Sequence, residues 1–296
     1  MWRTVSELVA YGLRLLRPSL LSAITYLLLE AVMEREKLIL PGERVDDLQL
    51  GGLSIIQNPS GFCFGVDAVL LSDFAKAKHG AHIVDLGTGN GILPLLLSAK
   101  TKASRITAFE IQDEVADMAR RSVLYNALEN RIQIIAEDLR NAFSHLNKSS
   151  VDVVVTNPPY VAGGGGLVNP KDVKAIARHE IHCTLEDVIR TAAQLLKPGG
   201  SFYMVHRPSR LPDMIELMRH FKLEPKALRI VHPRRGQAPN ILLIKGVRGG
   251  GAEMRVEPPL YVYAEEGGYD PEILEIYRRA GVDPTPRDPE KKGEDQ

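Results

Sequence analysis

The sequence has few cysteines, no excess of either charge and no long hydrophobic run. Its two cysteines, Cys63 and Cys183, have no close partner in the sequence, so neither a disulfide framework nor a Cys/His zinc pattern can be built from them. Both are interpreted as reduced thiols in a cytoplasmic protein. Lysine plus arginine number 37, as do aspartate plus glutamate, so the formal net charge is zero. This argues against a sequence-blind polyanion binder and leaves room for a local basic face.

The most apolar stretch, from Pro18 to Met33, follows Arg3, Arg14 and Arg17. It is shorter than the roughly 20 residues of a membrane-spanning helix, it contains Glu30, and no small-residue cleavage site follows it. Residues 1–33 are therefore interpreted as an N-terminal apolar extension, either an upstream segment or a weakly packed helix. Membrane anchoring is the less favoured alternative.

From residue 82 onward, short apolar strands alternate with helical patterns. Strands are expected at 82–85, 105–110, 131–136, 151–156, 201–205, 228–231 and 240–245, and helices at 66–78, 92–100, 113–128, 184–196, 208–221 and 271–279. This alternation predicts an α/β fold with a Rossmann-like, doubly wound, mostly parallel sheet. Residues 34–65 are expected to be rich in loops. A main domain is predicted over 34–247, a C-terminal extension over 248–283, and a charged, Pro-rich disordered tail over 284–296.

The first of these strands ends in Asp85 and runs into LGTGNG, after which a helical pattern begins. Gly87, Gly89 and Gly91, with Thr88 between them, would allow a tight turn and a close ligand, and the helix would offer free N–H groups. This context indicates a nucleotide-type cofactor site. The spacing G-x-G-x-G lacks the last glycine of the dinucleotide pattern G-x-G-x-x-G. The aminoacyl part of S-adenosylmethionine (SAM) carries an ammonium group, which Asp85 could attract. The pattern therefore favours SAM over NAD.

Two further carboxylates stand at the ends of the next two strands. Glu110 ends RITAFE and could accept hydrogen bonds from both hydroxyls of a ribose. Asp138 follows the third strand, in IIAEDLR, and could accept one from an adenine amino group. Either acid alone would usually be a solvated residue. Together with Asp85, they place an acid at three successive strand ends, which strengthens the prediction of a SAM site.

The fourth strand ends in TNPPY, where two prolines fix the backbone and remove two N–H donors. The Asn157 side-chain oxygen and the Pro158 carbonyl could each accept one N–H of a planar amine, while the Tyr160 ring stacks on it. The nitrogen lone pair would then be free to attack a sulfonium methyl group. We predict a catalytic set of Asn157, Pro158, Pro159 and Tyr160 that acts by positioning and electrostatics, with no metal. An ordinary turn is the alternative.

These motifs resemble class I SAM-dependent methyltransferases of the Asn-Pro-Pro-Tyr group, and more closely the bacterial tRNA(Val) adenine-N(6) methyltransferase-like family. The resemblance spans about Glu43 to Val247 and is carried by FGVDAVLL, VDLGTGNGILPLLL, TNPPY, AIARHE, TLEDVIR and VHRPSR. It implies a seven-stranded class I methyltransferase fold, a methyltransferase domain over 34–247, and conversion of SAM to S-adenosylhomocysteine (SAH). The implied SAM contacts are Asp85, Gly87, Gly89, Glu110 and Asp138, and the implied amine contacts are Asn157, Pro158 and Tyr160.

The resemblance also implies a substrate, the adenine beside the anticodon of a tRNA, flipped out of its stack. Between residues 206 and 235, eight lysines and arginines stand against three acids, which is compatible with an RNA-binding face. The candidate RNA contacts are Arg178, Arg207, Arg210, Arg234 and Arg235. The alternatives are methylation of a protein glutamine or of ribosomal RNA, and a non-catalytic RNA-binding protein on the same fold. Stable DNA binding is not expected.

Overall fold

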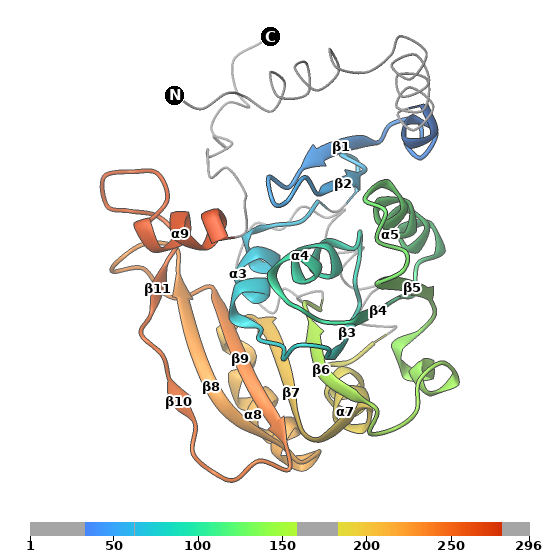
Figure 1. Ribbon diagram of the computed structural model, residues 1–296. Coiled ribbons are helices and arrows are strands. Elements are labelled where there is room, and N and C mark those ends of the chain that lie inside the picture. Colours follow the sequence, from blue (N-terminus) through green and yellow to red (C-terminus); the bar gives the residue numbers. More distant parts are fainter. Residues whose placement is uncertain (1–32, 62, 159–182, 280–296) are drawn as a thin grey trace.

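The computed structural model describes residues 33–61, 63–158 and 183–279 (Figure 1). The apolar stretch before Met33 and the tail after residue 283 lie outside these ranges. So do three predicted site residues, Pro159, Tyr160 and Arg178. No helix of the described ranges is both long and apolar enough to cross a bilayer.

A nine-stranded sheet forms the centre of the described chain, in the order β10-β8-β9-β7-β6-β3-β4-β5, with β11 also paired to β8. Its seven longer strands are β3 (His82–Leu86), β4 (Arg105–Glu110), β5 (Ile132–Ala136), β6 (Val151–Thr156), β7 (Leu196–His206), β8 (Leu223–His232) and β9 (Ile241–Arg248). Only β9 runs antiparallel to its neighbours, β7 and β8. The predicted Rossmann-like, mostly parallel α/β architecture is confirmed.

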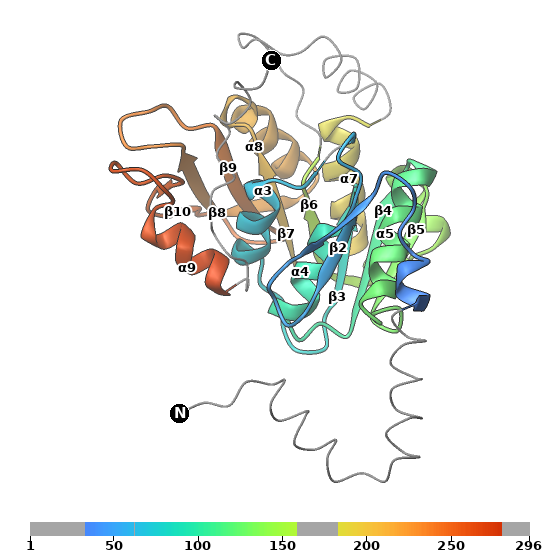
Figure 2. The ribbon, with the colours of Figure 1, turned by 90° about the horizontal axis from the view of Figure 1, so that it is seen from above.

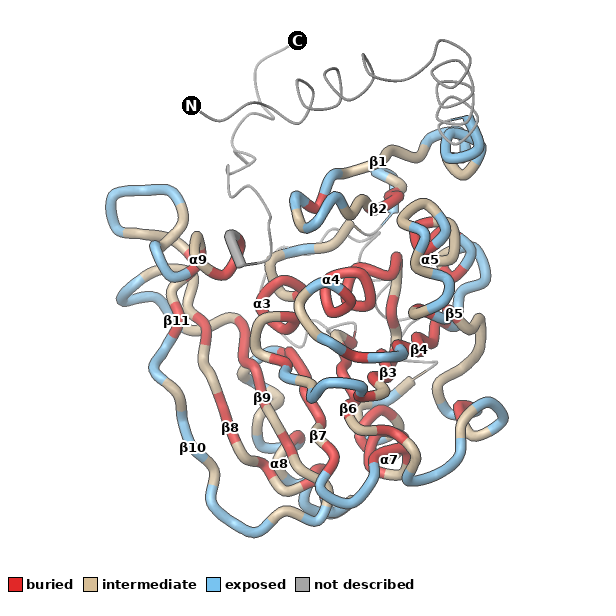
Figure 3. The backbone as a smooth tube through the Cα atoms, viewed as in Figure 1, coloured by how far each residue is buried: buried red, intermediate tan, exposed pale blue. Residues whose placement is uncertain are grey.

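The two further strands come from the predicted C-terminal extension, so the sheet is wider than the seven strands expected. β10 (Arg255–Val256) and β11 (Leu260–Tyr261) each pair with β8, in parallel. Two-residue strands carry no periodic signal, which explains why the sequence did not reveal them. These two strands lie along the edge of the main sheet, with β10 exposed to solvent (Figure 3).

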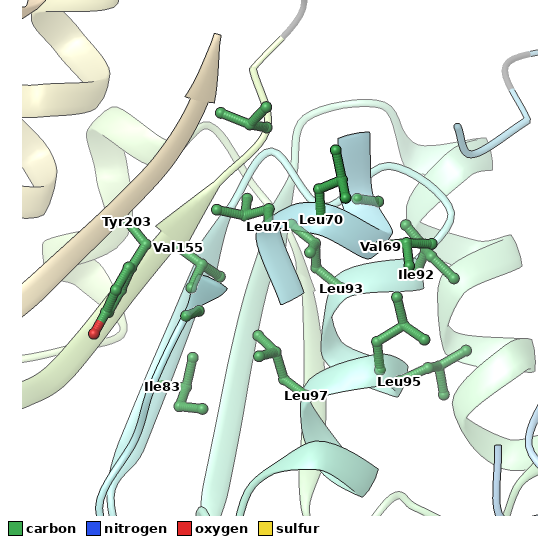
Figure 4. Close-up of a cluster of buried hydrophobic side chains, with 14 of the residues drawn as sticks. Val69, Leu70, Leu71, Ile83, Ile92, Leu93, Leu95, Leu97, Val155 and Tyr203 are labelled. Carbon is green, nitrogen blue, oxygen red and sulfur yellow. The ribbon is translucent and has the colours of Figure 1, made fainter. Parts of the chain in front are cut away.

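Helices cover both faces of the sheet, as expected for a doubly wound fold (Figure 2). Side chains of α3 (Val66–Phe74), α4 (Ile92–Lys100), α5 (Asp113–Tyr125) and α9 (Pro271–Arg279) share one hydrophobic core with the first face. Those of α7 (Leu185–Leu195) and α8 (Leu211–His220) form a second core with the opposite face. Two 3-10 helices, η1 (Leu139–Ser144) and η2 (Pro208–Arg210), follow β5 and β7. α4 is buried over almost its whole length because it is packed between α3, α5 and the sheet (Figure 4).

The segment expected to be loop-rich contains a β-hairpin, formed by β1 (Arg44–Asp47) and β2 (Ser54–Gln57). Its outer edge is bonded to α5: the Ile56 N–H donates to Ser122 Oγ at 3.0 Å, and the Ser54 N–H to Asn126 Oδ1 at 2.8 Å. Arg121 of α5 also pairs with Glu43, with contacts of 2.5 and 2.7 Å. These partners are more than 60 residues away in sequence, so a local pattern did not predict the hairpin.

Candidate cofactor and substrate site

The predicted site residues meet at the carboxyl edge of the sheet, where β3 lies between β4 and β6. Asp85 of β3 is paired with Ala108 on one side and with Val155 on the other. The order of strands along the chain reverses at β3, and in open α/β sheets this reversal opens the crevice in which ligands bind. The Thr156 hydroxyl donates to the Leu86 carbonyl at 2.8 Å, which ties the end of β6 to the end of β3.

The glycine loop between β3 and α4 has the conformation that its glycines were expected to provide. Gly87, Gly89 and Gly91 all have positive φ, at 76°, 58° and 85°. At Gly91, a Cβ atom would also lie only 3.2 Å from the Cβ of Ala119 in α5. The Gly87 and Thr88 N–H groups both donate to the carbonyl of Phe109, which fixes the loop against β4. α4 starts directly behind the loop, at Ile92.

Asp85 is the most unusual side chain at this edge. It is completely buried, and neither of its carboxylate oxygens has a hydrogen-bond partner among the described residues. Burial raises its pKa to about 7, and the negative charge of Glu110 adds to the rise. The neighbouring Thr88 hydroxyl makes this rise in pKa smaller, although its contact with Asp85 falls short of hydrogen-bond geometry. Buried polar atoms in native proteins are nearly always paired, so these oxygens point to a ligand that donates to them.

Glu110 is buried at the end of β4 and faces the glycine loop. One carboxylate oxygen accepts the Gly89 N–H at 2.9 Å, and the other accepts the Gln112 N–H at 3.0 Å. The second oxygen also accepts the Gln112 side-chain amide, at 3.4 Å. A carboxylate has about four acceptor positions, so the oxygen bonded to Gly89 keeps capacity for another donor. Glu110, the predicted acceptor of ribose hydroxyls, is therefore held in place by backbone N–H groups and can still accept a further hydrogen bond.

Asp138 follows β5, as predicted, but its carboxylate is already engaged. It caps η1 by accepting the Arg140 N–H at 2.8 Å, and both of its oxygens accept the Arg140 Nε–H, at 3.0 and 2.9 Å. The Arg140 guanidinium holds the pKa of this carboxyl below its usual range, although burial opposes the effect. An adenine amino group would have to share or replace the bonds with Arg140, an interaction that the sequence did not predict.

Asn157 and Pro158 directly follow β6, at the same edge as the glycine loop. Asn157 is half-buried and Pro158 is buried, so the described half of the TNPPY motif is part of the packed edge. His206, at the end of the adjacent β7, is also buried, and its Nδ1 accepts the Arg207 N–H at 2.8 Å. Burial and the charge of Arg210 lower its pKa to about 4, which keeps the imidazole neutral at physiological pH.

Two buried amide side chains, one in the glycine loop and one in the hairpin, were not predicted from the sequence. Asn90 and Gln57 are each 2% exposed, and the Asn90 amide donates to Gln57 Oε1 at 3.1 Å. The same oxygen accepts the Phe64 N–H, and the Gln57 amide donates to Asp46. Gln57 therefore connects the loop to the hairpin. The two amides are 33 residues apart, and only tertiary structure brings them together.

The structure divides the basic segment 206–235 between opposite ends of the sheet. β8 runs parallel to β7, so the β8–β9 loop lies at the carboxyl edge with four predicted RNA contacts, Arg207, Arg210, Arg234 and Arg235. Arg207 reaches this loop by donating to the Asn240 carbonyl at 3.0 Å. Lys222 immediately precedes β8, about 30 Å from that strand's carboxyl end at the usual rise per residue. The eight cations therefore do not form one face.

Residues 65–223 match the methyltransferase small domain family. The chain belongs to this family. The family is SAM-dependent, which confirms both the predicted enzyme class, a methyltransferase, and the predicted cofactor. The crystal structure of a predicted O-methyltransferase from Agrobacterium tumefaciens covers 73% of this methyltransferase and 98% of its own chain, with a TM-score of 0.60 and 24% identity. That likeness confirms the class I methyltransferase fold.

Curated relatives of this methyltransferase carry the name tRNA1(Val) (adenine(37)-N6)-methyltransferase. The protein from Bacteroides fragilis strain YCH46 is 28% identical over 180 residues, which are 61% of this chain and 75% of that one. The protein from Aeromonas hydrophila is 24% identical over 213 residues, which are 72% of this chain and 87% of that one. The family resemblance recognised in the sequence is confirmed.

Proposed function

We propose that this methyltransferase transfers the methyl group of SAM to the exocyclic N6 of an adenine in tRNA, close to the anticodon. The position of Asn157 and Pro158 carries the proposal: they follow β6 at the edge where β3 ends in the glycine loop. The names of the curated relatives support the same target atom and the same substrate. With a tRNA substrate, the protein would act in the cytoplasm.

The residues around the glycine loop fit SAM. The two unpaired oxygens of Asp85 and the unpaired Thr88 hydroxyl, all buried, suit the donors of an aminoacyl group. The remaining acceptor capacity of Glu110 suits a ribose. Bound SAM supplies a methyl group on a positively charged sulfur. Ionisation of a buried carboxyl is costly when the group is alone. Beside an ammonium group the ionisation becomes favourable, because the opposite charge offsets the cost of desolvation.

The proposed role of the Asn-Pro-Pro-Tyr segment is to hold the target amine. The Asn157 side-chain oxygen and the Pro158 carbonyl would each accept one N–H of the amine. The nitrogen would move away from planarity, and its lone pair would be directed at the methyl group. These two acceptors would stabilise the transition state more than the bound substrate, because the nitrogen gains positive charge in the transition state. The flipped base and its stacking on Tyr160 are part of the proposal.

The decisive experiment incubates the protein with methyl-labelled SAM and bulk tRNA that lacks the modification, and then digests the RNA to nucleosides. Label in N(6)-methyladenosine is expected. Label in another nucleoside would overturn the target atom. Absence of label from tRNA, with SAM binding intact, would overturn the substrate and favour a protein glutamine or a ribosomal particle. The Asn157→Ala variant is the matched control, because it should bind SAM without methylating RNA.

A further inference from the structure

A second cleft, of about 660 Å³, lies away from the glycine loop, on the face of the sheet that α3 covers. Its floor comes from β7, β8 and β9, one wall from the end of α3 with Phe74, and the other wall from residues 253–257 of the C-terminal extension. That second wall lies beyond residue 223, where the family match ends. Volumes of this order are typical of sites for small ligands.

Two hydrogen-bond donors on the floor of this cleft have no hydrogen-bond partner among the described residues, and neither donor atom is fully buried. Lys245 is half-buried in the middle of β9 and forms no ion pair with any described residue; its Nζ lies 5.6 Å from the centre of the Tyr203 ring. Tyr203 is 2% exposed, and no described residue hydrogen-bonds to its hydroxyl. Figure 4 shows this hydroxyl at the end of the ring that points away from the leucines of α3 and α4.

The other cations that line the cleft are already paired or bonded. Lys76 donates to the Asp73 carbonyl at 2.5 Å. Arg229 pairs with Glu272 at 2.5 Å, and Arg255 pairs with Glu257 at 2.7 Å. Lys226 donates to the carbonyls of residues 251, 252 and 253, at 3.1, 3.0 and 2.8 Å. These bonds hold the wall in place, including a residue in an unfavourable backbone conformation with φ of 83°, Glu253.

The charge of the lining favours an anion. Five basic side chains face three acidic ones, Asp73, Glu253 and Glu257, and Glu272 beside the cleft neutralises Arg229, which leaves one positive charge in excess. The ammonium of Lys245 and the hydroxyl of Tyr203 are both hydrogen-bond donors. The Phe74 ring, 5.8 Å from the Tyr203 ring and edge-on to it, adds an aromatic wall.

We propose that this cleft is a second ligand site, which binds a small organic anion of mononucleotide size with a planar ring. Lys245 and Tyr203 bind the anionic group, and the ring packs between Phe74 and the wall of the extension. The site lies apart from the catalytic edge, so occupation of the cofactor site does not exclude the ligand.

The test is calorimetric titration of the full chain with AMP, in saturating SAH so that the cofactor site is filled. AMP should bind at one site, and adenosine, which lacks the phosphate, should bind at least tenfold more weakly. Lys245→Met should weaken AMP binding at least tenfold, and Tyr203→Phe about three- to tenfold, the usual effect of one hydrogen bond. Lys102→Met, an exposed lysine outside the cleft, should have no effect.

Three results would overturn the proposal. They are the absence of AMP binding in the presence of SAH, equal affinity for AMP and adenosine, and AMP binding that Lys245→Met leaves unchanged. The comparison of AMP with adenosine uses the unaltered protein, so it remains decisive even if a variant does not fold.

Discussion

Replacement of Asp85 by asparagine should stabilise the protein against unfolding, and the gain should increase with pH. The carboxyl has an ordinary pKa of 3.8 in the unfolded chain and a pKa of about 7 in the fold. Between these values the folded protein holds a proton that the unfolded chain has released. The free energy of unfolding of the wild type therefore falls as the pH rises from about 4 to about 7. Asparagine cannot ionise, so the variant escapes this loss.

The magnitude follows from the two pKa values. At 1.36 kcal/mol per pKa unit, ionisation of Asp85 costs the folded protein about 4 kcal/mol at pH 8. At pH 5 the cost is about 2 kcal/mol, because the folded carboxyl is protonated there while the unfolded one is mostly ionised. The stability advantage of Asp85→Asn over the wild type should thus grow by about 2–3 kcal/mol between pH 5 and pH 8.

Urea unfolding without cofactor, followed by circular dichroism at pH 5, 6, 7 and 8, measures this difference. Asp113→Asn, at an exposed position in the first turn of α5, is the matched control and should show no such trend. The same Asp85→Asn variant should bind SAH at least tenfold more weakly, since it loses a charged acceptor. A stability advantage that is equal at pH 5 and pH 8 would refute the reasoning, because the carboxyl would then titrate alike in both states.

Three other variants test separate parts of the site. Asn157→Ala should lower turnover by about 10²–10³-fold with SAM binding kept, and unchanged turnover would contradict the proposed acceptor. Gly91→Ala should lower the free energy of unfolding in urea by about 1–3 kcal/mol, because φ at this position is 85° and the new Cβ would lie too close to Ala119. Equal stability of the variant and the wild type would mean that the loop can adjust its backbone to accept a Cβ. Changing Arg234 and Arg235 together to glutamate should weaken tRNA binding, and the slope of log affinity against log salt concentration should fall by about 1–2 in filter-binding assays. An affinity that depends neither on this change nor on salt would show that the two arginines are not part of the RNA-binding surface.

The sequence by itself determined the α/β class and the carboxyl-edge location of the site. Apolar strands alternating with amphipathic helices allow few other arrangements, and in a parallel sheet the residues that follow successive strands must share one edge. Asp85, Glu110 and Asn157 could be placed in this way because each directly follows or ends a strand. The boundaries of β4, β6 and α4 were predicted to the residue, since glycines and polar residues flank these apolar runs.

Only the tertiary structure decided which of these side chains are free to bind. Asp85 is buried without a hydrogen-bond partner among the described residues, whereas Asp138 is occupied by Arg140. The Gln57–Asn90 bond and the cleft around Lys245 depend on segments that are distant in the chain. Burial and hydrogen bonding depend on such long-range contacts, and no local pattern in the sequence records them.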